Sequence, residues 1–335
     1  MSFVRLDPRD VVVSADTVTA PVWSTGQPTL TTFHTSSAQQ IQSTADFYAE
    51  VFATSSDAAP VQFSIAYADE IGSGSAPFNT AVVGTSPSSV VFGQAKNLIL
   101  GEEDETFDFG TVTSDNFYVV TLNRSQYKEK LMPATFNITL TSGSNTIHLT
   151  DNSKDLSTTS FTEAGRVYQV VSGSDGAAYS GTGYTTDSGS YGWFLPDVGM
   201  ILFNAKALDL AGGDGGINLV TDRSTNDANA NNQIKLFKAI KAGGSFSLNS
   251  EETITSNYVF ARARSDEFNY SSNPSMINSS TGDLRHTDLI NSPRTYVTTV
   301  GLYNNNNDLL AVAKLSKPLQ KDFTKEALIR IKLDY

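Results

Sequence analysis

The stretch from Thr295 to Tyr335 constrains the fold most, because it predicts three consecutive β-strands. The first strand, Tyr296 to Tyr303, is rich in the β-branched and aromatic residues that pack well on a pleated sheet. The asparagines at 304–307 tolerate left-handed backbone, so they predict a turn into an apolar strand from Leu309 to Leu315. A second break is expected at 316–318, because Pro318 donates no backbone hydrogen bond.

The last run of the chain alternates between apolar and polar residues, with the period of two that is typical of a half-buried strand. One face carries Ile329, Ile331, Leu333 and Tyr335, and the other face carries Arg330, Lys332 and Asp334. A chain end normally frays unless a sheet or a similar element holds it. We therefore expect the C-terminus to be a strand of the core.

Composition favours a mainly β fold, with antiparallel sheets arranged like a β-sandwich, one or two short helices and long polar loops. Of the 335 residues, 17% are charged and 39% are hydrophobic, and Ser, Thr, Asn and Gly dominate the remainder. The clearest helix is Ser89 to Leu100, with Ser88 or Ser89 as its N-cap, because apolar residues recur there at helical spacing. Other strands are expected at Phe47–Phe52, Val61–Tyr67, Phe117–Leu122, Thr135–Leu140, Thr146–Leu149, Arg166–Val171, Tyr191–Leu195, Val198–Phe203 and Ile254–Arg264, and Ile234–Ile240 fits either a short helix or a strand.

Polar loops suggest how the chain is divided. Thr29 to Ser43 predicts an extended arm or loop, and Ser172 to Ser190 predicts a mobile loop, because its Gly, Ser, Thr and Asp residues cannot build a core. Such loops are most frequent in the middle of the chain. We expect a discontinuous β core of residues 1–126 and 250–335, with a loop-rich β domain of residues 127–249 inserted into it.

Charge and cysteine content exclude several classes of function. The net charge of −12 disfavours a nucleic-acid partner, whose phosphates require a basic surface, and it disfavours binding to anionic membranes. The absence of cysteine excludes disulfides, thiolate metal sites and cysteine nucleophiles. The first residues do not resemble a secretory leader, and no stretch approaches the ~20 apolar residues of a membrane span. We expect a protein made in a cytoplasm.

Motifs for catalysis, cofactors or metals are not evident. His34, His148 and His286 are far apart in sequence and lie in no known catalytic pattern, and His148 is expected to face solvent. The glycine-rich stretches at 72–75 and 212–216 lack the Lys-Ser/Thr pair of a phosphate-binding loop. The acidic residues 102–105, and Asp209, Asp214 and Asp222, lack the spacing of an EF-hand, so solvated charge is the default interpretation. We expect no enzyme, no cofactor and no metal.

Tyrosines in polar loops are the candidate interface residues. Tyr179, Tyr184 and Tyr270 lie among Gly, Ser and Asn residues, and loop aromatics are enriched at protein interfaces. The same residues fit equally well as anchors that pack loops on sheet edges. The N-terminal arm, Met1 to Gln40, is a further candidate, expected to become ordered on assembly.

Several segments together resemble a family of virion structural proteins from tailed bacteriophages, associated with marine and cyanobacterial phages that have contractile tails. The segments are Phe63–Asn79 (FSIAYADEIGSGSAPFN), Val90–Gly110, Phe117–Leu140, Tyr191–Asn204 (YGWFLPDVGMILFN), Phe268–Ser275 (FNYSSNPS) and the C-terminal part from Tyr296. The resemblance covers about Phe63 to Tyr335 and supplies no catalytic residues. It implies a subunit of the virion, in the tail or baseplate, whose partners are other virion proteins and copies of itself.

Two alternatives remain beside this expectation. A neck, collar or fibre-attachment protein would belong to the same particle. A β protein that binds or cleaves host carbohydrate would be of another class, and exposed tryptophans would favour it. The chain has only Trp23 and Trp193, and the apolar run around Trp193 predicts that this residue is buried.

Overall fold

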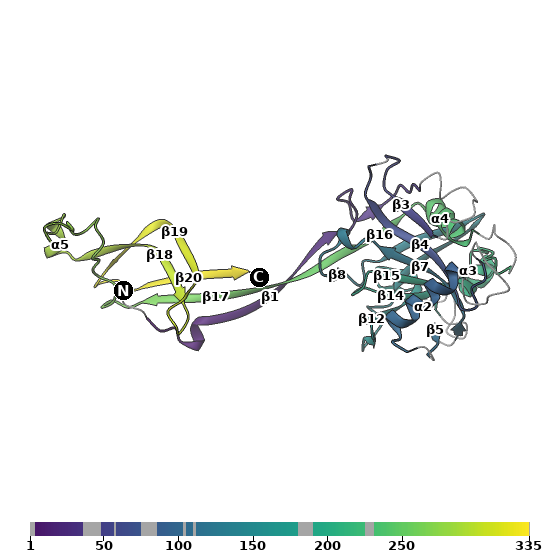
Figure 1. The fold of residues 1–335 in the computed structure, drawn as a ribbon, viewed down its shortest axis with the longest axis horizontal. Coiled ribbons are helices and arrows are strands. Elements are labelled where there is room, and N and C mark those ends of the chain that lie inside the picture. The colour runs from purple at the N-terminus through teal and green to yellow at the C-terminus, as the bar shows by residue number, and fades with distance from the viewer. Residues whose placement is uncertain are drawn as a thin grey trace. The chain divides into compact units, whose positions relative to one another are not determined.

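The computed structural model describes residues 4–35, 48–56, 58–74, 86–102, 105–109, 112–179, 190–224 and 231–334, and it is mainly β, as expected (Figure 1). The chain forms two compact units. The terminal unit consists of Met1–Thr17 and Thr253–Tyr335, and the central unit consists of Val18–Glu252. Among the described residues, no helix is long and apolar enough to cross a membrane.

The central unit is built on one antiparallel sheet of twelve strands. Its main path runs β2 (Thr29–Leu30), β16 (Phe246–Ser247), β9 (Asn137–Ser142), β10 (Asn145–Asp151), β12 (Gly165–Ser174), β14 (Gly192–Leu195), β15 (Met200–Asn204), β7 (Asn116–Leu122), β4 (Val61–Asp69) and β3 (Tyr48–Phe52), with β11 (Ser160–Thr162) and β13 (Ala177–Ala178) beside β12. His34, just after β2, exchanges backbone hydrogen bonds with Phe52 in β3 at 2.9 and 2.7 Å. The first and last strands of the path therefore approach each other, and the sheet is strongly curled.

The middle of this sheet is buried on both faces. Successive residues of a strand point to opposite faces. In β7, Tyr118 and Val120 belong to one hydrophobic cluster, which we call the inner cluster, while Phe117 and Val119 belong to another, the outer cluster. The same alternation occurs in β14 and β15. Two-sided burial explains why these strands read as continuous apolar runs rather than as an alternating pattern.

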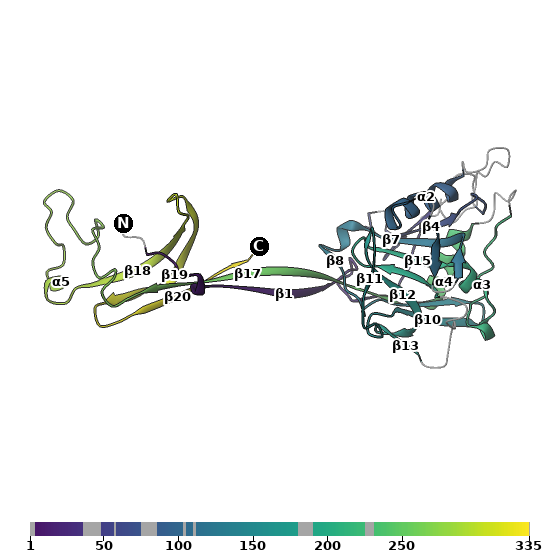
Figure 2. The ribbon, with the colours of Figure 1, turned by 90° about the horizontal axis from the view of Figure 1, so that it is seen from below.

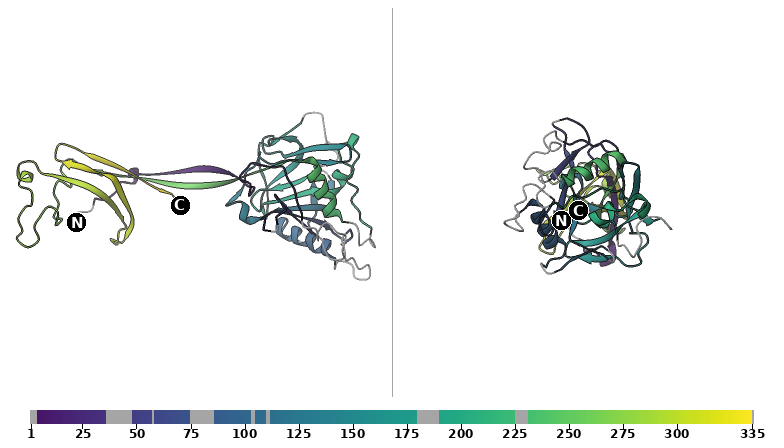
Figure 3. Two further views of the ribbon diagram at one scale, coloured as in Figure 1. Left: turned by 90° about the horizontal axis from the view of Figure 1, so that it is seen from above. Right: turned by 90° about the vertical axis from the view of Figure 1, so that its right-hand side faces the viewer.

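Two helices cover the two faces. α2 (Pro87–Ile99) packs beside β4, and its Phe92, Ala95 and Ile99 join Phe117 in the outer cluster (Figure 2). α4 (Asn232–Gly243) packs against β9 and supplies Leu236 and other apolar residues to the inner cluster; Figure 3 shows α4 in green and α2 in blue. The hairpin β5 (Phe107–Phe109) and β6 (Val112–Ser114) completes the outer cover.

The remaining elements of the central unit are short. They are β8 (Lys130–Leu131), α3 (Ala205–Asp209) and the 3-10 helices η2 (Arg124–Gln126) and η4 (Gly212–Asp214). β8 pairs with the beginning of β17 (Asn249–Ala263), at Ser250 and Glu251.

The terminal unit consists of narrow sheets with little core. β1 (Val11–Pro21) pairs with β17, which also pairs with β20 (Ala327–Asp334), whereas β18 (Arg294–Tyr303) and β19 (Leu309–Asp322) form a separate two-stranded sheet. η1 (Pro8–Asp10) and α5 (Asp288–Asn291) are its helical turns. Among its described residues, the buried hydrophobic side chains are Val259, Ala327 and Ile331.

The predicted strand boundaries at the C-terminus hold in part. The turn at the asparagines and the strands on either side are present, and Ile331 and Lys332 lie on opposite faces as expected. The predicted break at Pro318 is wrong, because β19 continues through it. The pairing shifts from Val297↔Leu319 to Thr299↔Lys314, so the proline lies in a bulge, where no ladder hydrogen bond is lost.

The expectation that the C-terminal strand belongs to the core is also wrong. Both hydrophobic clusters consist of residues of the central unit, and in β20 only Ala327 and Ile331 are buried. The alternating pattern of β20 was predicted correctly. The sequence pattern did not predict how few apolar residues cover the inner face of β20.

Other expectations differ from the structure in smaller ways. The stretch from Thr29 is not a free arm in its described part, because Leu30 forms β2 and Phe33 is buried. α2 begins two residues before the predicted start, since Pro87 occupies the first helical position and Ser86 is the N-cap. Residues 234–240 are helical. The predicted loop at 172–190 contains the end of β12 and β13, and residues 180–189 lie outside the described part of the chain.

The division of the chain falls at other residues than expected. β9, β10, β12, β14 and β15, from the predicted insert, share one sheet with β4 and β7, from the predicted core. The insert is not a layer of its own, because its strands complete the sheet that buries both clusters. The boundaries between the units lie instead within β1 and β17.

The two-sided sheet makes Phe117 a sensitive test of this packing. Its ring lies 4.6 Å from that of Phe107 and 5.2 Å from that of Phe92. Phe117→Ala is expected to lower the free energy of unfolding of the central unit by about 3–5 kcal/mol, because it leaves a cavity in the outer cluster. Denaturant unfolding followed by tryptophan fluorescence measures this. Thr121→Ala, at the exposed position of the same strand, should change it by less than about 0.5 kcal/mol; equal losses in the two variants would contradict the assigned packing.

Candidate functional site

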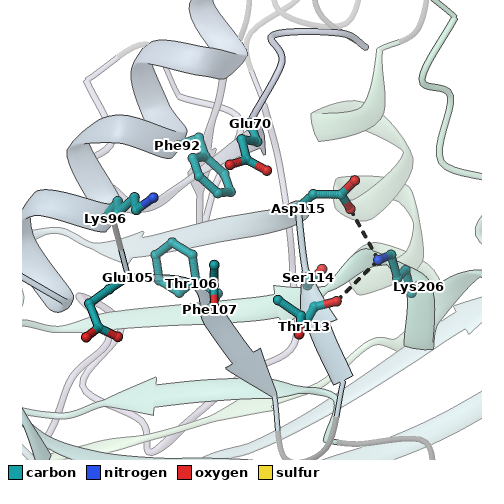
Figure 4. Close-up of a pocket in the computed structure, with 10 residues that line it drawn as sticks. All are labelled: Glu70, Phe92, Lys96, Glu105, Thr106, Phe107, Thr113, Ser114, Asp115 and Lys206. Atoms are coloured by element: carbon teal, nitrogen blue, oxygen red, sulfur yellow. Dashed lines mark hydrogen bonds and ion pairs between the residues drawn. The ribbon is translucent and has the colours of Figure 1, made fainter. Parts of the chain in front are cut away.

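An open hollow of about 240 Å³ lies in the central unit between α2, the β5–β6 hairpin and α3 (Figure 4). Its lining residues are Glu70, Phe92, Lys96, Glu105, Thr106, Phe107, Thr113, Ser114, Asp115 and Lys206. Two lysines and three carboxylates therefore surround an aromatic floor. The mixture of charges favours no single class of ligand.

Asp115 and Lys206 form the polar side of the hollow. Asp115 occupies the turn between β6 and β7, and Lys206 lies in the first turn of α3, whose N-cap is Asn204. The Nζ of Lys206 lies 3.3 Å from Oδ1 of Asp115 and donates a hydrogen bond to the carbonyl of Thr113 at 3.3 Å. The lysine thus ties α3 to the hairpin.

Behind the hollow, Arg223 joins two carboxylates. Its Nε donates to Oδ2 of Asp69 at 2.7 Å, and one terminal nitrogen donates to Oδ2 of Asp115 at 2.9 Å. The side chain of Asp69 is fully buried and also accepts from the hydroxyl of Tyr67 at 3.3 Å and the backbone N–H of Ser73 at 3.2 Å. A buried carboxylate requires such partners, so the network fixes the end of β4 against the start of β7.

The pKa shifts of Asp115 and Tyr67 move both groups away from the range that suits acid–base catalysis near neutral pH. Burial acts to raise the pKa of Asp115, but the hydrogen bond and charge of Arg223 outweigh it and hold that pKa below its usual range. Burial raises the pKa of Tyr67, and the charge of Asp69 adds to the shift. A proton carrier for catalysis requires a pKa near the working pH. The network therefore supports a positioning role for these side chains.

The histidines lie in ordinary environments. His148 is exposed, as expected, and its Nδ1 lies 3.0 Å from the hydroxyl of Thr139, its partner across the β9–β10 ladder. No carboxylate among the described residues hydrogen-bonds to its other ring nitrogen, which a hydroxyl–imidazole catalytic pair needs for orientation. His286 is exposed and His34 is half-buried.

The acidic residues do not gather into a cation site. In the described part of the chain, no group of three His, Asp or Glu residues is placed to hold a metal ion. Asp209 instead accepts hydrogen bonds from the N–H and hydroxyl of Thr221, at 2.8 and 2.9 Å, and Asp222 accepts from the N–H of Ser224. Glu103 and Asp104, of the 102–105 cluster, lie outside the described residues.

The candidate interface tyrosines have different surroundings. Tyr270 is 84% exposed and Tyr179 is 46% exposed, so both have accessible rings, whereas Tyr184 lies outside the described residues. The structure places Tyr270 in the terminal unit and Tyr179 in the central unit.

The loop that carries Tyr270 is firmly anchored. Lys321, in β19, is fully buried, and its ammonium group donates to the carbonyl of Ser265 at 3.1 Å and to Oδ1 of Asn269 at 2.8 Å. Thr295 adds a hydrogen bond to the carbonyl of Phe268 at 2.6 Å. Phe268 has φ +54°, a left-handed conformation that costs a bulky residue about 1–3 kcal/mol and persists only where its surroundings fix it. The exposure of Tyr270 is therefore maintained by specific contacts.

The strands of the terminal unit carry a set of exposed aliphatic side chains. We call them the terminal apolar side chains: Val11, Val12, Val13, Leu309, Leu310, Val312, Leu319 and Leu328, each between 36% and 68% exposed. Complete burial of one such side chain contributes about 1.5–3 kcal/mol. Exposed apolar groups that lie together on a surface mark sites of protein–protein interaction.

Sequence reasoning did not single out these side chains, although the signal was present. Three successive valines at 11–13, and Leu309 with Leu310, place apolar groups on both faces of their strands. Such runs predict strands that are buried on both sides. Only the structure shows that these side chains are exposed among the described residues.

Removal of Arg223 tests the buried network. Arg223→Met leaves the carboxylate of Asp69 buried without its cation, and we expect a loss of about 2–3 kcal/mol of stability at neutral pH, moderated because Arg223 is 34% exposed. The depressed pKa of Asp115 contributes stability above its ordinary pKa of 3.8 that is lost as the pH falls through the depressed value, so the difference between the proteins should shrink in acid. Urea unfolding at several pH values measures it.

Lys206→Met is the matched control, since it removes a lysine that is 47% exposed and should cost less than about 1 kcal/mol. A loss for Arg223→Met that stayed constant between neutral and strongly acidic pH would contradict the electrostatic assignment.

Removal of Lys321 tests the anchored loop. Lys321→Ala deprives Ser265 and Asn269 of a charged donor, and we expect local opening of residues 264–270 to become easier by about 2–4 kcal/mol. Hydrogen exchange read by mass spectrometry on peptides that cover this loop measures the change. Lys325→Ala, at an exposed position, should leave the exchange unchanged; unaltered protection in Lys321→Ala would refute the anchoring role.

Comparisons of the chain with protein-family models, with curated proteins and with solved structures found no match. The roles of the hollow, the tyrosines and the terminal apolar side chains therefore follow from their own chemistry and surroundings.

Proposed function

We propose that this chain is a non-enzymatic structural subunit of a tailed-phage particle, located in the tail or baseplate and made in the host cytoplasm. The observation that carries the proposal is the set of terminal apolar side chains. A subunit that acts by assembly must present surface that becomes buried only against neighbours, and these aliphatic groups are such a surface. The kind of particle, a tailed phage, is taken from the resemblance of the sequence to virion structural proteins.

The distribution of exposed apolar residues supports assembly through the terminal unit. Among the described residues, 16 large exposed hydrophobic side chains lie in its 100 positions, against nine in the 235 positions of the central unit. Isolated exposed hydrophobic residues are normal on any protein surface. A density this uneven is characteristic of a surface with a partner.

The charged hollow and the histidines add nothing that favours an enzyme. The carbohydrate-binding alternative requires flat aromatic faces for sugar rings to stack upon. Trp23 is 2% exposed and Trp193 is 7% exposed, so neither indole offers such a face. None of the exposed aromatic side chains among the described residues is a tryptophan, and only two of them, Tyr296 and Tyr303, share a strand; they are Tyr48, Phe161, Tyr179, Tyr270, Tyr296, Tyr303 and Phe323. Assembly is the stronger proposal.

Immunogold electron microscopy tests the location. Antibody against the recombinant chain, applied to particles from the source lysate, should place gold at the distal end of the tail. Gold at the neck would instead favour a connector or fibre-attachment role. Absence of gold from both intact and disrupted particles would refute the virion assignment, because disruption exposes epitopes that are buried in the assembled particle.

A further inference from the structure

We infer that the terminal unit associates with the terminal units of other copies of this chain, in a closed ring of at least three copies that buries the terminal apolar side chains. The inference deepens the proposed assembly role by naming the partner. Burial, strand order and charge of the terminal unit all point to such a ring, whatever position the chain takes in a particle.

Among its described residues, the terminal unit lacks a core of its own. Its 100 residues bury three hydrophobic side chains, among those described, whereas the two large clusters lie wholly in the central unit. A two-stranded sheet such as β18–β19 is marginal in water unless a face is covered. The described residues leave the faces of these strands uncovered, and a partner would supply the missing cover.

The strands of the terminal unit need cover on both faces. In β1 every residue except the half-buried Ser14 is exposed, and Val12 points to the face opposite that of Val11 and Val13. In β19 Leu309 and Leu310 are 53% and 68% exposed on opposite faces. One flat contact with one partner covers one face. Each copy therefore meets two neighbours, and a ring with two neighbours per copy contains at least three.

The sheets of the terminal unit have open strand edges. β1 and β20 are the outer strands of their sheet, and β18 and β19 form a pair with two outer edges. Unpaired backbone groups on such edges accept a further strand readily. Identical copies bring identical edges and apolar faces, so the terminal unit offers both partners of the contact.

The charge distribution indicates that the partner of the terminal unit is a second copy of the chain. The terminal unit carries 12 of the 23 Lys and Arg residues and 11 of the 35 Asp and Glu residues, a net charge of +1. The central unit carries the remaining 11 basic and 24 acidic residues, a net charge of −13. Copies can pack through a nearly neutral unit without repulsion, whereas contact through the central units brings like charges together.

The mass of the purified full chain in solution tests the inference. Native mass spectrometry and light scattering should give at least three times the 36.0 kDa of one chain. The oligomer should persist at high salt, because salt screens the repulsion between central units and leaves apolar contacts intact. A monomer or a dimer, or dissociation by salt, would overturn the inference.

Matched lysine substitutions locate the contact. Val12→Lys and Leu310→Lys place a charge among the terminal apolar side chains and should weaken association about a hundredfold each. Val90→Lys and Leu98→Lys are the controls on α2 of the central unit: Val90 is 51% exposed against 49% for Val12, and Leu98 is 45% exposed. Association that is unchanged by the first pair, or weakened equally by the controls, would refute the assigned surface.

Folding of the variants is checked separately. Both tryptophans are buried in the central unit, so their fluorescence reports its integrity whatever happens to the terminal unit. Dissociation with unchanged fluorescence, and with faster hydrogen exchange in 253–334, is the expected result. Dissociation accompanied by an altered tryptophan signal would contradict it, because the effect would then arise in the central fold.

The inference and the proposed function can fail independently. A monomeric chain that is nonetheless labelled with gold on particles would refute self-association and leave the virion role intact, with another protein as the partner of the terminal unit. A ring whose antibody labels no particle, intact or disrupted, would leave self-association intact and refute the virion role.

Discussion

The burial of β7, β14 and β15 on both faces is the packing on which the central unit depends. Phe117 and Trp193 contribute to the outer cluster, while Tyr118 and Phe194 contribute to the inner one. A slip of one residue in any of these pairings would exchange the two faces, and large aromatic rings would meet the wrong neighbours. The register is therefore fixed from both sides. The curl that brings His34 to Phe52 encloses the inner cluster, and α2 with the β5–β6 hairpin is needed to cover the outer one.

The terminal unit uses different interactions, because it has no comparable apolar layer among its described residues. Its internal contacts are polar: Ser256 donates to Asp334 at 2.6 Å, and Lys321 gathers three oxygens around one ammonium group. Such contacts fix geometry well, but each contributes little net stability, because water satisfies the same groups in the unfolded chain. In the proposed assembly, the hydrophobic contribution to folding would come from burial of the exposed aliphatic groups against other copies. The proposed association would then also stabilise the fold of this unit.

Local pattern predicted the elements better than their environment. The strands at Phe117–Leu122 and Tyr191–Leu195 and the helix near Ser89–Leu100 were recognisable, because propensity and periodicity act over a few residues. Periodicity gives the faces of β20 but says nothing about what lies against them, so a strand of the terminal unit was assigned to the core. The contribution of residues 127–249 to the main sheet depends on pairings distant in sequence, such as β15 with β7, which no local pattern contains.

The same limit applies to the candidate site. Tyr270 was singled out from its polar neighbours and is exposed in the structure, but the left-handed Phe268 and the buried Lys321 that hold its loop left no recognisable signal. A lysine in a strand normally indicates a solvated face. Its burial here follows from three oxygen acceptors, two of which lie more than fifty residues away in sequence. Arg223 likewise reaches Asp69 across the fold.

The two units differ in both net charge and exposed apolar side chains. The central unit has two sheet ends of its own, at β2 and β3, and their edges would also invite pairing between molecules. The hydrogen bonds between His34 and Phe52 occupy part of those edges, and a net charge of −13 opposes the approach of a second central unit. In the terminal unit, the described strand edges lack such hydrogen bonds, and a net charge of +1 does not oppose the approach of a second copy. In the proposed ring, association is directed to the terminal unit, and closure ends it at a defined number of copies instead of continuing into a fibre.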